Sequence, residues 1–297
     1  MPAAITHFLQ AERVMEALNQ KKGSEPVQRQ AFLWGAQGPD FFYCHRVLPW
    51  QKGISLKEYG GKLHREKPSI FFDILREYYF LSPRDHTVLS YLYGFLCHYS
   101  LDRTAHPFIH FTTQALLKDN HNQDQKAMHH QIESALDTIM LRYEKAALPI
   151  EFNLKSTVPK NKELQTMMAD LFSHVLETLY GAEIDTPLLY QATEDCRAAY
   201  GLLNDRTALK KSLIERLEKH NILRSVSCHI RPVSEGDQFD YANILNAGWA
   251  WPYDSGEKSE SSFFDLYESS ILESIALIES FLEREEFFKL VNEIPFV

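Results

Sequence analysis

The feature that most constrains this chain is the spacing of its apolar residues, which recurs with a helical period over most of the sequence. Such spacing gathers the apolar side chains on one face of a helix. It is clearest at residues 124–147, where one stripe holds Met128, Ile132, Leu136, Ile139 and Met140. Alternating patterns are rare, and only 223–231 is predicted as a short strand. The sequence therefore predicts an all-α fold built as a multi-helix bundle.

Proline and glycine set the limits of the predicted helices, because both disrupt the regular backbone. Pro68 marks a break or a new start, and Pro107 lies just past the segment that we expect to end near residue 105. Residues 40–57 are predicted as loop, and 221–257 as irregular. The predicted helices lie at 8–18, 27–36, 58–80, 86–105, 124–147, 161–180, 187–202, 206–219 and 261–284.

The length of 297 residues allows one large domain or two modest ones. Prolines at 149 and 159 in a polar stretch indicate a joint near residue 150. We therefore expect a metal-binding domain at 1–150, with a helical C-terminal region at 151–297 packed on it.

Charge and composition narrow the class of protein. The net charge of −9 argues against duplex nucleic acid as a partner, because phosphate binding needs surplus Lys and Arg. No run is apolar enough for a transmembrane segment, and the start does not resemble a secretory signal. The four cysteines form no C-x-x-C pair and are expected as free thiols. These features favour a cytoplasmic location.

Histidine is concentrated in one part of the chain: nine of the 13 histidines fall between His45 and His130. The sharpest motif is His98-Tyr-Ser-Leu-Asp102-Arg-Thr-Ala-His106. On a helix these three side chains fall within about 80° of one another and span about 12 Å. Imidazole nitrogens and a carboxylate that can bridge two ions are suitable zinc ligands. The alternative is a partly exposed polar face.

Other candidate ligands are weaker taken singly. His129 and His130 precede Glu133 by one turn, and spacing alone does not choose between them. Gly-Pro-Asp40 places its carboxylate in a turn near the surface, where a capping role is the ordinary alternative. For His64 and His7 the alternative is a solvated side chain. Together these residues supply enough ligands for more than one metal.

At this point the chain resembles the bacterial zinc-dependent phospholipase C family, over roughly residues 1–145. The motifs are Met1-Pro-Ala-Ala-Ile-Thr-His7, Gly38-Pro-Asp40, His64, Gly94-Phe-Leu-Cys-His98 through His106-Pro107, His129-x-x-x-Glu133 and Asp137-Thr-Ile. A weaker feature lies at Asn243, Asn246, Trp249 and Trp251-Pro252, whose aromatics line the cleft, join the two halves or simply form a core patch.

The resemblance implies a largely helical fold that binds two or three zinc ions. His64, His98 and Asp102 would hold one ion, with Asp40 close to it. His106, His129 and Glu133 would hold a second. His7, a bridging Asp102 and the chain's N-terminus would hold a third. The secreted members have more residues between the bridging Asp and the next His than the three found here, which changes the second site.

The implied activity is phospholipase C-like hydrolysis of phosphoester bonds in a small phosphoester or a phospholipid, which allows transient membrane contact. Asp40 would be the catalytic residue, orienting or deprotonating the attacking water. Tyr99, Thr104 and Gln131 are candidates for fixing the imidazole tautomers. Two alternatives stay open: a 3′-nucleotidase or nuclease-like phosphoesterase, and a non-catalytic binding protein that the metal stabilises.

Overall fold

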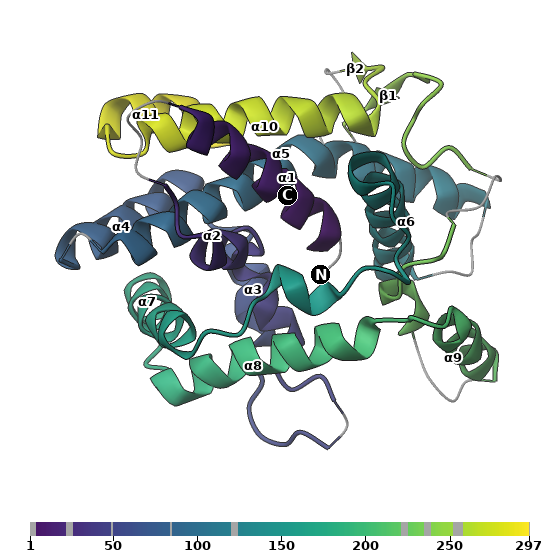
Figure 1. Ribbon diagram of the computed structural model, residues 1–297, viewed down its shortest axis with the longest axis horizontal. Helices are drawn as coiled ribbons and strands as arrows, with labels where there is room; N and C mark the ends of the chain where they lie inside the picture. The colour runs from purple at the N-terminus through teal and green to yellow at the C-terminus, as the bar shows by residue number, and fades with distance from the viewer. Residues whose placement is uncertain are drawn as a thin grey trace.

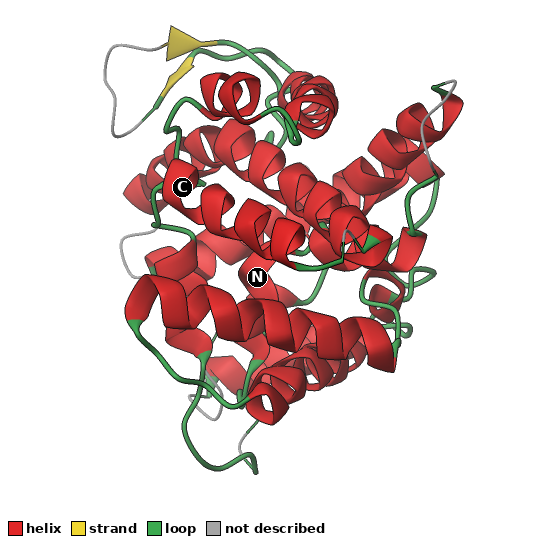
Figure 2. Ribbon diagram, turned by 90° about the vertical axis from the view of Figure 1, so that its left-hand side faces the viewer, coloured by secondary structure: helices red, strands yellow, loops and turns green. Residues whose placement is uncertain are grey.

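The protein is almost entirely helical, as the apolar spacing predicts. The computed structural model describes residues 4–21, 26–48, 50–83, 85–119, 124–220, 225–234, 239–251 and 258–296. Over these residues the β structure is a single antiparallel pair of two-residue strands, β1 (Trp249–Ala250) and β2 (Lys258–Ser259). Figure 2 shows this pair at one corner of a molecule otherwise built from helices. The all-α prediction is confirmed.

The first half of the chain forms helices that surround one long central helix. Their bounds are α1 (Ala4–Gln20), α2 (Arg29–Gly35), the 3₁₀ helix η1 (Gly38–Cys44), α3 (Lys57–Leu63), α4 (Pro68–Leu81), α5 (His86–Asp119) and α6 (Gln125–Lys145). The long helix α5 packs against α2, α10, α6 and α1, so it runs through the middle of the structure.

The second half adds helices on two sides of this centre. They are η2 (Leu154–Thr157), α7 (Lys162–Tyr180), α8 (Thr186–Leu203), α9 (Leu209–Lys219), η3 (Ser227–His229), α10 (Phe263–Ser280) and α11 (Arg284–Val291). In Figure 1, α10 and α11 lie along the upper edge and α7 and α8 along the lower edge. Over the described residues, no helix has both the length and the apolar character that crossing a bilayer requires.

Two glycines let α2 and α5 approach closely. A Cβ on Gly35 would collide with the backbone of Tyr91, and a Cβ on Gly94 would collide with the backbone of Phe32. The two helix backbones therefore pack directly on each other. This contact places the end of α2, and the η1 segment that follows it, beside the middle of α5.

Three predicted elements differ from the structure. The helix at 86–105 does not end before Pro107 but continues to residue 119 with the proline inside it. A proline removes one helical hydrogen bond, and the burial of Phe108 and Ile109 just beyond it favours the continued helix. The loop at 40–57 begins only after η1, because the Gly-Pro step starts a 3₁₀ helix.

The strand predicted at 223–231 is wrong for its described part, where η3 occupies 227–229, while residues 223 and 224 lie outside the described residues. The helix predicted at 261–284 is α10, which ends at Ser280, and after a turn at residues 281–283 the chain forms a further helix, α11, that the sequence pattern does not predict.

The two halves of the chain share one core. The indole Nε1 of Trp34 donates to the carbonyl of Pro159 at 2.8 Å. The carboxylate of Asp137 accepts from the backbone of Ile5 and Thr6 and forms a buried ion pair with Arg231 at 2.7 Å. This one side chain thus ties α1, α6 and the segment after α9 together. The division at residue 150 stays a prediction.

The aromatic feature near residue 249 joins the halves rather than forming an open wall. The ring of Trp249 is buried against Phe108 of α5, with 5.5 Å between ring centroids, and its Nε1 donates to Ser261. Asn243 holds the same loop together, because its amide donates to the carbonyls of Ala247 and Ser261. Pro252 lies outside the described residues.

Candidate metal centre

The centre is built on α5, which presents three of the predicted ligands on one face. The Nε2 atom of His98 lies 3.1 Å from Oδ2 of Asp102, and the Nε2 atom of His106 lies 3.9 Å from Oδ1. His98 and Asp102 are buried, and His106 is nearly so. The helical spacing of the motif therefore produces the shared face that the sequence predicts.

Two further imidazoles reach the same carboxylate from other helices. The Nε2 atom of His7, on α1, lies 3.2 Å from Oδ1 of Asp102. The Nε2 atom of His64, which caps the C-terminal end of α3, lies 3.6 Å from Oδ2. Four imidazoles therefore face one buried carboxylate, which is the arrangement expected of a residue that bridges ions.

Asp40 joins this group from η1. Its Oδ1 lies 3.3 Å from Nε2 of His64, and its side chain is buried. The prediction of a turn near the surface is therefore wrong, because η1 packs inward against α5 and α8. Burial favours a higher pKa for Asp40, but the hydrogen bond and charge of His64 help lower the pKa to about 2.

Gly38 shapes the approach of η1 to α5. Its φ angle is +51°, a conformation that favours glycine, and a Cβ at this position would collide with the ring of His98. The Gly-Pro-Asp motif therefore serves two purposes: it starts η1 and leaves room for a ligand.

α6 supplies the other predicted ligands. Oε1 of Glu133 lies 3.1 Å from Nε2 of His129 and 3.8 Å from Nε2 of His106 on α5. The second oxygen, Oε2, lies 3.2 Å from Nδ1 of His130. The spacing motif left His129 and His130 undecided, and the structure places both beside Glu133, on different oxygens.

Over the part of the chain that the structure describes, three groups of potential ligand atoms result, each with its atoms within 4.8 Å of one another. The groups are His7, His98 and Asp102; Asp40, His64 and His98; and His106, His129 and Glu133. All eight predicted ligands are included. The last group has the predicted composition despite its short spacing between Asp102 and His106. The N-terminus, predicted as a ligand of the third ion, lies outside the described residues.

The buried carboxylates are held in the ionised form. Burial favours a higher pKa for Asp102, yet the charges of His98 and His106 and the hydrogen bonds around it hold the pKa well below its usual range. Burial acts in the same direction on Glu133, and His129 above all lowers its pKa well below the usual range. Both side chains are therefore anionic at neutral pH and suited to a cation.

The pKa values of His98 and His106 are shifted in opposite directions. Burial lowers the pKa of His98, a direction that favours the neutral ring that binds metal. Burial also acts to lower the pKa of His106, but Asp102 and Glu133 outweigh it and raise the pKa to about 9. The protonated ring of His106 is thus stabilised by the negative charges of Asp102 and Glu133.

The donor set fits zinc, which prefers imidazole nitrogen and carboxylate oxygen. Each group offers three protein ligands, the number that catalytic zinc sites use while keeping one position for water or substrate. Nδ1 of His7 and Nδ1 of His98 are buried without a hydrogen-bond partner among the described residues. It is Nε2 of each ring, not Nδ1, that lies beside Asp102 and would face a cation there.

Backbone carbonyls orient two of the rings. Nδ1 of His64 contacts the carbonyl of Gly60 at 2.7 Å, and Nδ1 of His106 contacts the carbonyl of Phe296 at 2.7 Å. Each contact places a proton on Nδ1 and leaves Nε2 to face the carboxylates.

The side chains predicted for this orienting role act elsewhere. Tyr99 donates to the carbonyl of Ile294, Thr104 donates to the carbonyl of Ser100, and Gln131 is exposed on α6. The polar residues nearest in sequence are therefore not the ones that orient the rings.

The sequence analysis missed three contributors. His110 follows His106 by one turn, with its ring centroid 5.2 Å from that of His129; an uninterrupted α5 would have indicated it. The ring centroid of His229, in η3, lies 4.6 Å from that of His130. Phe296 contacts the rings of His64 and His98. No sequence pattern identifies the last two, because they reach the site through long-range packing.

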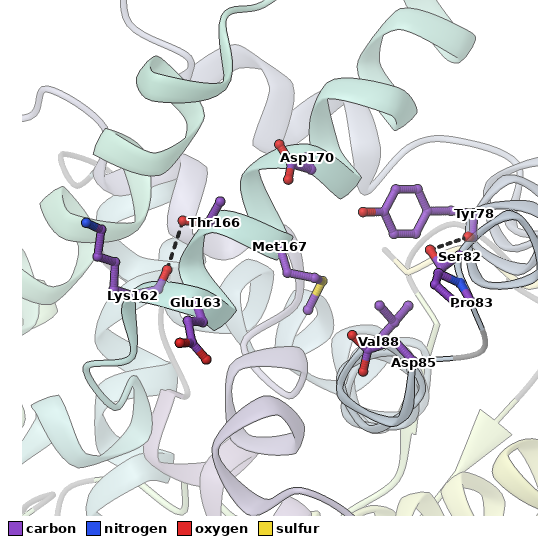
Figure 3. Close-up of a pocket in the computed structure, with 10 residues that line it drawn as sticks. All are labelled: Tyr78, Ser82, Pro83, Asp85, Val88, Lys162, Glu163, Thr166, Met167 and Asp170. Carbon is purple, nitrogen blue, oxygen red and sulfur yellow. Dashed lines mark hydrogen bonds between the residues drawn. The ribbon is translucent and has the colours of Figure 1, made fainter.

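A separate surface cavity of about 570 Å³ lies between α4, the start of α5 and α7. Figure 3 shows Tyr78, Asp85, Glu163, Met167 and Asp170 among its lining residues. None of the eight predicted ligands lines it, and none of the three ligand groups lies there. It is therefore distinct from the metal centre.

Comparison with known proteins adds one finding. A family model described as zinc-dependent phospholipase C matches residues 6–182, which covers more than half of the chain and runs from α1 through α7. Neither the curated proteins nor the solved structures gave a match. The matched region contains every residue of the three ligand groups. The chain therefore belongs to the zinc-dependent phospholipase C family, and it is a zinc-dependent phosphoester hydrolase.

Proposed function

We propose that the protein hydrolyses a phospholipid at the bond between glycerol and phosphate, giving diacylglycerol and the phosphorylated headgroup. The observation that carries this proposal is the carboxylate of Asp102, buried and faced by His7, His64, His98 and His106. A carboxylate in this position joins neighbouring ligand groups into one cluster, as two-metal hydrolytic sites require.

The proposed roles follow from the contacts. His7, His64, His98, Asp102, His106, His129 and Glu133 would hold two or three zinc ions, with Asp40 beside His64. Zinc in such a cluster supplies a Lewis acid for the phosphoryl oxygens and lowers the pKa of water. The carbonyls of Gly60 and Phe296 would keep the rings of His64 and His106 in the tautomer that points Nε2 inward.

Asp40 is the proposed general base. Its low pKa keeps the carboxylate ionised at neutral pH, and its position beside His64 lets it accept a hydrogen bond from the attacking water and orient it. Water then adds to phosphorus and the bond to the glycerol oxygen breaks. That oxygen takes up a proton from solvent water, and the proton accepted from the attacking water returns to solvent. Burial of Asp40 and its contact with His64 fix where the proton is taken up.

The donor sets favour catalysis over a purely structural metal. Structural zinc sites are usually closed by four protein ligands, whereas among the described residues the group of His106, His129 and Glu133 offers three. The four cysteines are buried thiols, which supports a reducing compartment and the cytoplasmic location that we propose.

Metal analysis combined with an activity assay tests the proposed function. We expect more than one zinc per chain by elemental analysis, and release of a phosphorylated headgroup from phosphatidylcholine that stops when the metal is chelated. Short phosphate esters and mononucleotides are assayed alongside. Zinc-free active protein would contradict the proposal, and activity on nucleotides alone would favour the nucleotidase alternative.

A further inference from the structure

One loop beside the metal centre exposes an unusual set of apolar side chains. We define the docking loop as residues 45–48 and 50–56, which lie between η1 and α3. Trp50 is 70% exposed and Ile54 is 79% exposed, with Val47 also exposed. Large apolar side chains gathered on one loop and left in water indicate an interaction surface.

The loop is held in shape rather than loosely extended. The guanidinium of Arg46 donates to the carbonyl of Ile54 at 2.8 Å, and the hydroxyl of Ser55 donates to the carbonyl of His45 at 2.8 Å. The backbone N–H of Leu56 donates to the ring of His45 at 2.9 Å. These bonds tie the two ends of the loop to each other.

α8 fixes the loop from the side. The carboxylate of Asp195 accepts from the backbone N–H of Arg46 at 3.0 Å and from the amide of Gln51 at 2.7 Å. Asp195 is buried, so its charge faces the loop backbone and not the solvent. The apolar side chains are therefore presented outward by a preformed scaffold, which lowers the entropic cost of binding.

The charge of the loop is opposite to that of the protein. The docking loop contains Arg46 and Lys52 and no Asp or Glu, and Lys57 follows it at the start of α3, whereas the whole chain has a net charge of −9. Lys52 and Lys57 are exposed. The nearest acidic residue in sequence, Glu58, lies just beyond the loop and pairs with Lys62 at 3.3 Å. The loop is thus a cationic and apolar surface on an acidic molecule.

The loop is also attached directly to the metal centre. It follows η1, which carries Asp40, and precedes α3, which ends at His64. In Figure 1 the loop extends past α3 and α8 at the lower edge of the molecule, away from α10 and α11 at the upper edge. Whatever it binds is therefore held on the side of the protein that supplies these two residues.

We propose that the docking loop binds an anionic phospholipid surface, with Trp50 and Ile54 in the interface and Lys52 near the headgroups. This inference rests on the proposed phospholipid substrate. Tryptophan favours the membrane–water interface, and lysine is attracted by anionic lipid. A symmetric contact between two copies would set Arg46 and Lys52 against the same cations, which disfavours a second chain as the occupant.

Vesicle flotation tests the proposal. The full chain is mixed with vesicles of phosphatidylcholine and phosphatidylglycerol in equal amounts, or with phosphatidylcholine alone. We expect binding to the anionic vesicles, reduced roughly tenfold or more in the Trp50→Ser/Ile54→Ser variant. Lys52→Gln should weaken it about fivefold. Leu272→Ser, at an exposed leucine on α10, is the matched control and should bind unchanged.

Hydrolysis of two substrates separates this proposal from the proposed function. The double variant should lose activity on the anionic vesicles but retain it on a short-chain phosphatidylcholine kept below its micelle-forming concentration. Vesicle binding without any hydrolysis would leave the docking loop supported and overturn the proposed function. Equal vesicle binding by the double variant and the unaltered chain would overturn the docking loop.

Quenching of tryptophan fluorescence by lipid gives a second test, which begins with the unaltered protein. Lipids brominated near the glycerol should quench part of the fluorescence of the full chain, and Trp50→Phe should remove that part while keeping vesicle binding. Because phenylalanine is also large and apolar, this test does not depend on a variant that loses vesicle binding. Unchanged quenching in Trp50→Phe would overturn the proposal. So would sedimentation without vesicles in which the unaltered protein is an oligomer and Trp50→Phe is a monomer, because Trp50 would then lie in a contact between chains.

Discussion

Asp102 is the residue on which the metal centre depends most. Its two carboxylate oxygens lie between His7 and His106 on one side and His64 and His98 on the other. Loss of its charge would leave four imidazoles without the anion that they share. Asp40, in contrast, lies at the edge of this arrangement, with its Oδ1 3.3 Å from Nε2 of His64.

Substitution of the two aspartates should therefore have different effects. Asp102→Asn should release zinc and abolish activity, because a neutral amide cannot serve as a bridging anion. Asp40→Asn should keep more of the metal and lower kcat by roughly 10²–10⁴-fold, the usual contribution of a general base. Elemental analysis and steady-state kinetics measure both. Equal metal loss in the two variants would contradict the separate roles.

Gly38 is the second residue with a specific prediction. Gly38→Ala should cost roughly 1–2 kcal/mol for the left-handed backbone and should also displace the ring of His98. Gly181→Ala is the control, because Gly181 has a φ of +61° and nothing within 4 Å of its Cβ position. The midpoint temperature of thermal unfolding should fall in both variants, but the zinc content should fall only in Gly38→Ala. Zinc loss in both would mean that backbone strain alone is responsible.

At the scale of single elements, α5 illustrates what the sequence could predict. Helical spacing placed His98, Asp102 and His106 on one face, and the structure has them there. Pro107 predicts a helix end near residue 105, whereas the continued helix places His110 one turn after His106. Local rules describe the cost of a proline but not the burial beyond it that keeps a helix going.

The segment after α11 is the element that no local pattern identified. The hydroxyl of Tyr99 donates to the carbonyls of Ile294 at 2.6 Å and Val291 at 3.2 Å, while Phe296 is fully buried and accepts from His106. Contacts across 190 residues of sequence are invisible to periodicity. Helical spacing therefore predicts the ligands on α5 but not the carbonyl that orients one of them.

This attachment predicts an effect of Tyr99→Phe. Removing the hydroxyl leaves the carbonyl of Ile294 without this donor, while the carbonyl of Val291 keeps its bond from Arg103. The loss should cost about 1 kcal/mol of unfolding free energy. It should also speed zinc release, because the segment that orients His106 is held less firmly. Tyr267→Phe is the control, since that buried hydroxyl has no hydrogen-bond partner among the described residues. Unfolding in denaturant and a chelator-driven zinc release assay give the two readouts.

At the scale of the whole molecule, the buried pair of Asp137 and Arg231 connects regions that the sequence assigned to separate halves. Asp137 is fully buried, and its carboxylate also binds the start of α1 through Ile5 and Thr6. The motif at Asp137 contributed to the family resemblance, but its partner in the second half carried no signal. A pairing between residues 94 positions apart depends on the finished fold.

Asp137→Asn should therefore destabilise the whole protein. Removing one partner of a buried ion pair leaves an uncompensated charge, at a cost of about 3–5 kcal/mol. Asp73→Asn removes the partner of Arg284 in an exposed pair and should change stability little. Equilibrium unfolding in urea compares the two. Similar stabilities for both variants would show that the Asp137 contact is dispensable.

The order of the ligands along the chain has a consequence for synthesis. The group of Asp40, His64 and His98 cannot be complete before residue 98 has been made, and the group that ends at Glu133 needs α6 as well. A chain leaving the ribosome therefore completes these groups one after another, at His98, then at Asp102 and finally at Glu133. Capture of the first ion could stabilise a half-made protein while its remaining helices are still being translated.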